Sequence, residues 1–131
     1  MKKILLVGAI ALGLQGCAMH NILPSFWDDN QSAAIIDVRQ SVEQLDCAKP
    51  HAPQVKVIKD NIEWFNLYSE SKGMMQNDVV ELVEPMKETV DDFYKRSVEK
   101  QGSEGYCKAK KRIMQTQASK AAQGVLGRID L

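Results

Sequence analysis

The side chains best suited to chemistry in this sequence are its three cysteines and two histidines. The cysteines stand at positions 17, 47 and 107, and the histidines at positions 20 and 51. Nucleophilic catalysis would need one of these histidines as a base. The sequence contains no Gly-x-Ser-x-Gly, no His-Glu-x-x-His and no glycine-rich phosphate loop. We therefore expect a protein that is not an enzyme and that needs no cofactor.

One cysteine–histidine pair has the spacing of metal ligands. Cys47 and His51 are four residues apart, which would bring both side chains to one face of a helix. Pro50 lies between them and is unfavourable inside a helix. The sequence therefore favours no metal site, although the spacing keeps this alternative open.

The amino terminus has the pattern of an export signal. Lys2 and Lys3 precede an uncharged apolar run over 4–14. A helix of about 11 residues is roughly 16 Å long, whereas the hydrocarbon core of a bilayer is about 30 Å thick. We therefore expect a cleaved signal rather than a transmembrane anchor.

The end of this signal resembles the bacterial lipobox. The residues that carry the resemblance are Leu14-Gln15-Gly16-Cys17. It implies cleavage before Cys17 and acylation of both the Cys17 thiol and the new amino group. Ala18 follows the cysteine, which by resemblance to enterobacterial lipoproteins implies sorting to the outer membrane. The alternative is an ordinary export signal that contains a cysteine.

A lipidated Cys17 leaves Cys47 and Cys107 in an oxidising compartment. Two remaining cysteines can form only one intramolecular disulfide, and we expect that bond. The predicted organisation is a signal peptide over 1–16, a lipidated amino terminus and tether over 17–30, and a periplasmic helical domain over 31–131.

Composition limits the mature chain to one small domain with a weak net charge. Removing the first 16 of 131 residues leaves 115 and takes away two of the 17 basic residues, against 17 acidic ones. This balance of 15 against 17 does not indicate a nucleic-acid partner. Hydrophobic residues make up 44% of the chain and aromatic residues only 6%, which predicts a largely aliphatic core.

Apolar residues at helical spacing predict an all-α domain, a small bundle of about four helices. We expect these helices over about 30–47, 54–71, 77–99 and 104–126, with Asp29 or Asn30 capping the first and Ser103 the last. Pro85 lies inside the third and predicts a kink or a restart near Leu82. Because the disulfide would join the end of the first helix to the start of the last, those two helices should be neighbours.

The apolar faces of these helices give the predicted core. The first carries Ala34, Ile35, Val38, Val42 and Leu45; the last carries Tyr106, Ala109, Ile113, Ala118, Ala121, Ala122, Val125 and Leu126. Methionines are flexible enough to fill gaps in a core or to line an adaptable groove. We expect the core role for most of them.

An unusually wide apolar face on the second helix suggests a partner-binding surface. Trp64 and Tyr68 widen the face of that helix, and Met74 and Met75 lie in the turn that follows Gly73. These four side chains are the predicted partner-binding residues, forming a concavity that accepts a helix.

The layout of helices, cysteines and loops resembles the small all-helical pilotin lipoproteins of type II secretion. The elements that match are Leu45-Asp46-Cys47, Pro50 and Pro53, Gly73, Tyr94, and Tyr106-Cys107. The resemblance covers nearly all of the mature chain but includes no diagnostic motif. It implies a four-helix domain whose groove binds the carboxyl-terminal helix of an outer-membrane secretin.

Two other interpretations stay open. A lipoprotein encoded by a phage or plasmid would act in exclusion, or as the outer subunit of a spanin that pairs with an inner-membrane protein to fuse the membranes. A purely structural lipoprotein would have no specialised partner. All three predict an outer-membrane anchor through acyl chains and a domain in the periplasm.

Overall fold

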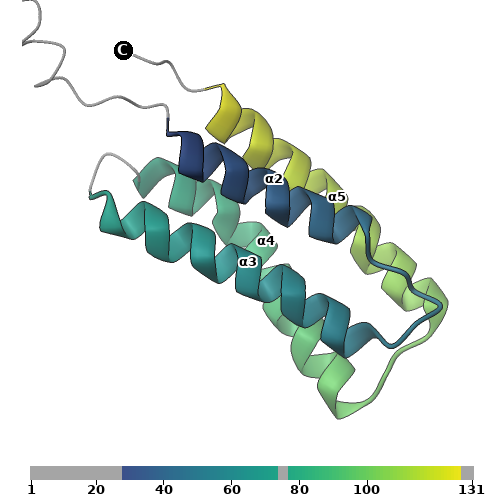
Figure 1. The fold of residues 1–131 in the computed structure, drawn as a ribbon. Helices are drawn as coiled ribbons and strands as arrows, with labels where there is room; N and C mark the ends of the chain where they lie inside the picture. The colour runs from purple at the N-terminus through teal and green to yellow at the C-terminus, as the bar shows by residue number, and fades with distance from the viewer. Residues whose placement is uncertain (1–27, 74–76, 128–131) are drawn as a thin grey trace, which may run out of the picture.

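The computed structural model describes residues 28–73 and 77–127. Within them the chain forms four helices and no strand, which confirms the predicted all-α class. The helices are α2 (Asp29–Glu43), α3 (His51–Ser71), α4 (Asn77–Glu99) and α5 (Glu104–Leu126). Successive helices run in opposite directions (Figure 1).

The four helices pack as a ring in which each helix contacts the two beside it. Helix α3 packs against α2 and α4, and α5 packs against α4 and α2. The first and last helices therefore lie side by side, as Figure 1 also shows and as the predicted disulfide requires.

Aliphatic side chains from all four helices fill the centre of the bundle. Every residue predicted for the apolar face of the first helix is buried, as are Met86 and Met114. The largest fully buried side chains are Phe65, Phe93, Ile35, Ile58, Ile62, Met86 and Met114. Both methionines therefore serve the core, Met86 from α4 and Met114 from α5, where flexible side chains can fill gaps.

The predicted buried face of the last helix was partly wrong. Ile113 is 46% exposed, and Ala109 and Leu126 are also exposed, whereas Met114 is fully buried. The buried positions follow the disulfide-bonded Cys107 with steps of seven, four, three and four residues: Cys107, Met114, Ala118, Ala121 and Val125. Because Cys107 fixes the rotation of α5, Ile113 turns toward solvent.

Two helix starts differ from the prediction, and prolines explain one of them. Helix α3 begins at His51 rather than near residue 54, with Pro53 in its first turn. A proline there removes only an amide that has no partner within the helix. Helix α2 is capped by Asp28, whose carboxylate accepts a hydrogen bond from the Gln31 amide at 3.0 Å, one residue before the expected cap. The predicted Ser103 cap of α5 is confirmed by its 3.1 Å bond from the Tyr106 amide.

Helix α2 ends earlier than the sequence suggested, and helix α4 keeps its predicted bounds without a break at Pro85. Helix α2 stops at Glu43 rather than near Cys47, although Leu45 remains buried beyond the end. Helix α4 runs through Pro85 as one element of 23 residues, so the predicted restart was wrong. The Pro85 carbonyl accepts bonds from Thr89 at 3.0 Å and from Gln117 of α5 at 3.2 Å.

Candidate functional site

Two of the four predicted partner-binding residues lie together on α3. The Trp64 and Tyr68 rings stack with their centroids 5.2 Å apart and their planes 5° from parallel. Trp64 is 51% exposed, and Tyr68 is partly buried. Met74 and Met75 lie outside the described residues, so their part in a concavity stays a prediction.

An open groove runs between α2 and α3, and Trp64 lines it. The groove has a volume of about 390 Å³ and is lined by Asn30, Ala33, Ala34, Asp37, Asp60, Asn61 and Trp64. We call these residues the α2–α3 groove. Beside Trp64, the second wall of the concavity is α2. The small alanine side chains leave room beside the indole of Trp64.

Tyr68 is held by polar contacts at the start of α2. Its hydroxyl donates to the Asp28 carboxylate at 3.1 Å and accepts a bond from the Asn30 amide at 3.1 Å. Lys72 lies 3.3 Å from the same carboxylate. Tyr68 therefore serves mainly to position the Trp64 ring that stacks on it, and the hydroxyl is already engaged.

These contacts also set the acidity of Asp28. Burial by itself raises the pKa of Asp28, but the Gln31 amide, the Tyr68 hydroxyl and Lys72 outweigh burial and hold this pKa below its ordinary value. The charged carboxylate is thus the form that the folded protein favours.

Replacing Asp28 by asparagine should therefore destabilise the domain in a pH-dependent way. At pH 7 we expect a loss of roughly 1 kcal/mol, because asparagine keeps the helix cap but loses the charged partner of Lys72. Because the pKa of Asp28 is lower in the folded chain than its unfolded value of about 3.9, the charged carboxylate stabilises the fold fully above that unfolded pKa. This stabilisation is lost as the pH falls through the folded-state pKa. Urea unfolding of both proteins between pH 7 and pH 3 should show the difference shrinking. Asp37→Asn is the matched control, and an unchanged gap at pH 3 would refute the assignment.

Two polar contacts, one of them buried, join the two groove helices. The side-chain amide of Gln31 in α2 donates to the Ser69 hydroxyl of α3 at 2.9 Å, and both residues are buried. The Asn61 side chain donates to the Asp37 carbonyl at 3.4 Å within the groove itself. Because a buried polar group without a partner is costly, the Gln31–Ser69 pair favours one register of α2 against α3.

The cysteines and the histidine of the domain lie at the opposite end of the bundle. Cys47 and Cys107 are disulfide-bonded with their Cα atoms 5.6 Å apart, as the sequence predicted. The His51 ring bonds the Cys47 carbonyl through Nε2 at 2.9 Å and packs against Phe93. The 28–73 and 77–127 segments contain no group of three or more metal-ligating side chains. His51 thus supports the loop that holds Cys47.

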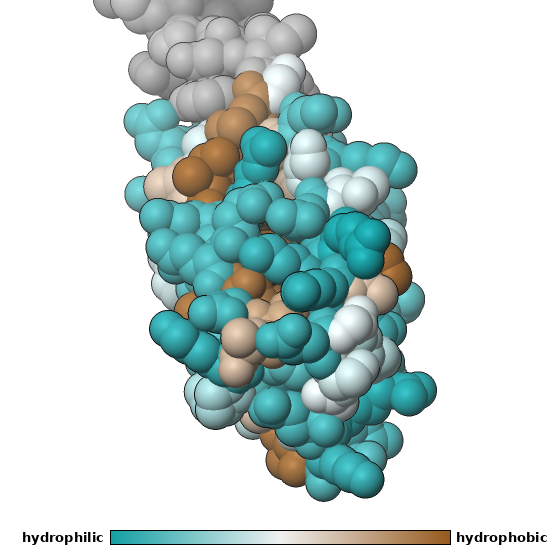
Figure 2. All heavy atoms as spheres, turned by 90° about the vertical axis from the view of Figure 1, so that its right-hand side faces the viewer, coloured by the Kyte–Doolittle hydropathy of each residue, from teal (hydrophilic) through white to brown (hydrophobic). Residues whose placement is uncertain are grey.

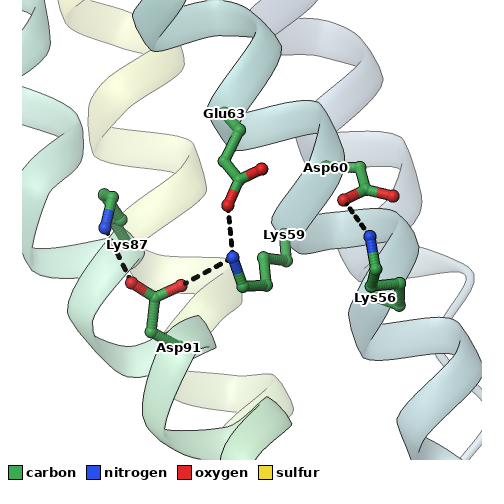
Figure 3. Close-up of polar contacts among 6 residues, drawn as sticks. All are labelled: Lys56, Lys59, Asp60, Glu63, Lys87 and Asp91. Carbon is green, nitrogen blue, oxygen red and sulfur yellow. Dashed lines mark hydrogen bonds and ion pairs between the residues drawn. The ribbon is translucent and has the colours of Figure 1, made fainter.

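Charged side chains beside the groove pair with one another. Figure 3 shows Lys59 of α3 between two carboxylates, Glu63 of the same helix and Asp91 of α4. Asp60 pairs with Lys56 on another side of α3. The bond to Glu63 is the main reason that the pKa of Lys59 is raised, against the opposing effect of burial. The Lys59–Asp91 pair joins α3 to α4, whereas Lys56 pairs with Asp60, a residue that lines the groove.

In Figure 2 the visible side of the bundle is mainly hydrophilic, and its apolar groups form small patches separated by polar ones. No helix among the described residues is long and apolar enough to cross a membrane.

No protein-family model, curated protein or solved structure matches this chain. The lipobox residues precede the described part of the chain, so Cys17 lipidation stays a prediction.

The sequence did not single out the α2 wall of the groove. Asn30, Ala33 and Asp37 are spaced by three and four residues, which places them on one helix face. The available signal was this strip of small and polar residues directly beside the apolar face. Only the packing of α2 against α3 shows that the strip faces Trp64.

Proposed function

We propose that this chain is a lipid-anchored protein of the outer membrane whose periplasmic domain is a non-enzymatic adapter. In this proposal the α2–α3 groove binds a helix of an envelope partner. The observation that carries the proposal is Trp64, which remains 51% exposed in the wall of a groove lined by small side chains.

An exposed tryptophan in a groove is a strong indicator of a binding surface. A tryptophan side chain removes a large apolar area from water when it is covered, and tryptophan is enriched among residues that dominate binding energy. Tyr68 holds the indole by stacking, so little side-chain entropy would be lost when a partner covers it. Ala33 and Ala34 allow the backbone of a partner helix to approach closely.

The residues best suited to catalysis have structural roles, which also supports a binding function. Cys47 and Cys107 are consumed by their disulfide, and His51 is buried against the Cys47 carbonyl. A nucleophile–base pair is therefore not assembled from the described cysteines and histidine.

A pilotin-like adapter is the version of this proposal that we favour. The described domain has a disulfide and a continuous aliphatic core, which suits a stable carrier of a partner helix. The partner would be a helix of an outer-membrane secretin. In the spanin or exclusion alternative, an inner-membrane protein would occupy the same surface.

Site-specific photocrosslinking in the native host tests whether a partner covers the surface between α2 and α3. We expect a photoreactive amino acid at position 57 to give a discrete higher-mass adduct with an envelope protein. Val57 is 52% exposed on α3, two helical turns before Trp64, in a second depression between α2 and α3. Mass spectrometry of the adduct would identify the partner and distinguish a secretin from an inner-membrane protein.

Val98 of α4 provides the matched control position. It is 59% exposed, similar to Val57, but lies on a helix that does not line the groove. Adducts of equal yield at both positions, or at neither, would count against the proposed binding surface.

A further inference from the structure

The α2–α3 groove carries acidic charge beside its apolar side chains. Asp37 of α2 and Asp60 of α3 are both exposed and both line it, and the lining contains no lysine or arginine. Asp60 is partly neutralised by Lys56. The Asp37 carboxylate has no hydrogen-bond or ion-pair partner within 28–73 and 77–127, although its backbone carbonyl accepts the Asn61 bond.

A second hollow lies between the same two helices, nearer the disulfide end. It has a volume of about 190 Å³ and is lined by Ser41, Gln44, Leu45, Gln54 and Val57. Val57 and Trp64 are seven residues apart on α3, which is two helical turns or roughly 10 Å. Both side chains are about half exposed. The surface therefore presents two apolar side chains along one line.

The acidic positions fall between these two apolar side chains. Asp60 lies three residues after Val57 and four before Trp64, and Asp37 shares the groove with it. A partner helix alongside α3 can match an apolar, acidic, apolar series with its own apolar, basic, apolar series. Residues seven apart on such a helix fall on one face, and a residue three or four along lies between them.

We propose that the α2–α3 groove is specific for a cationic amphipathic helix. Its occupant presents two apolar side chains, about seven residues apart, to Val57 and Trp64, and a lysine or arginine between them to Asp37 and Asp60. This inference rests on the proposed binding function and specifies the chemistry of the partner.

A displayed library of helical peptides tests both levels of the proposal. The library is selected against the purified full-length chain and, in parallel, against Trp64→Ala. We expect the wild-type protein to enrich peptides with apolar residues seven apart and a lysine or arginine at the third or fourth position between them. Trp64→Ala should enrich few of these peptides.

The outcomes separate the two proposals. Equal enrichment by the wild type and Trp64→Ala would overturn the groove as a helix-binding site, and the inference with it. Enrichment of peptides that have the apolar spacing but no basic residue between the apolar positions would overturn only the inference. If Trp64 emission in the protein alone changes on dilution, the groove is occupied by a second copy of the chain, which also overturns the inference.

Binding of an enriched peptide then measures the charge preference. The chain has two tryptophans, so Trp27→Phe leaves Trp64 as the only indole that reports on the groove. We expect replacement of the central lysine by glutamate to weaken binding about tenfold at low salt, because attraction to two carboxylates becomes repulsion from them. Equal affinity of the two peptides would overturn the charge preference.

A charge reversal on the protein provides the complementary test. Asp37→Lys, made in the Trp27→Phe background, should reverse the order of the two peptides. Glu88→Lys is the matched control, because Glu88 is exposed on α4 and lies away from the groove. If Glu88→Lys changes the preference as much as Asp37→Lys does, the effect is one of net charge and the inference fails.

Discussion

Replacing Cys47 and Cys107 together by alanine should lower the free energy of unfolding by about 4 kcal/mol. The two cysteines are 60 residues apart in the sequence, so their bond closes a long loop in the unfolded chain. On the chain-entropy model, a loop of that length accounts for this loss. Domains of this size have total stabilities of about 5–15 kcal/mol, so the bond contributes a large part of the total.

Thermal unfolding followed by circular dichroism is the direct measurement. A loss of this size corresponds to a fall of roughly 15 °C or more in Tm for a domain of about 100 residues. Cys17→Ala is the control, because it removes the third cysteine and leaves the 47–107 bond intact. A double variant within about 1 kcal/mol of the wild type would show that the loop is already restricted in the unfolded chain.

Because the Cys47–Cys107 disulfide is buried, its accessibility to a reductant gives a second test. Cys107 is fully buried and Cys47 is 7% exposed, so a reductant reaches the bond only when the end of the bundle opens. We expect the native protein to resist alkylation under mild reducing conditions and to become reactive in denaturant. Rapid alkylation of both thiols in the untreated native protein would show that the bond is absent.

The sequence predicted the helices well because their apolar spacing depends on local periodicity. The exact cap of α2 was not predictable in the same way. Asp28, Asp29 and Asn30 all have side chains suited to capping. Asp28 also contacts Tyr68 and Lys72 of α3 in the folded chain, and these tertiary contacts favour it as the cap.

The candidate site was predictable on one wall only. An apolar face too wide for the core marked Trp64, because a single helix has room for a limited buried stripe. The opposite wall depends on which α2 residues meet α3, and the Gln31–Ser69 bond fixes that register. Neither residue has a sequence pattern that indicates such a pairing. Asp37 therefore became part of the site only through the packing of the two helices.

Replacing Cys17 by serine should release the protein from the membrane. In the proposed lipoprotein the Cys17 thiol carries a diacyl group and its amino group a third acyl chain. Each buried methylene contributes about 0.8 kcal/mol, and two chains already give stable attachment. Serine provides no thiol for the first acylation, so neither that modification nor the cleavage that follows it would occur.

Fractionation of cells that express the full-length chain measures this effect. We expect the wild type to float with outer-membrane markers and to incorporate a labelled fatty acid. We expect Cys17→Ser to incorporate no label and to be largely absent from the outer-membrane fraction. Because an uncleaved signal could hold the variant at the inner membrane, outer-membrane flotation is the decisive readout. Cys47→Ala with Cys107→Ala should keep the label, which separates lipidation from the disulfide. If Cys17→Ser floats with the outer membrane as the wild type does, the contacts that hold the protein there come from the folded domain rather than from an acyl anchor.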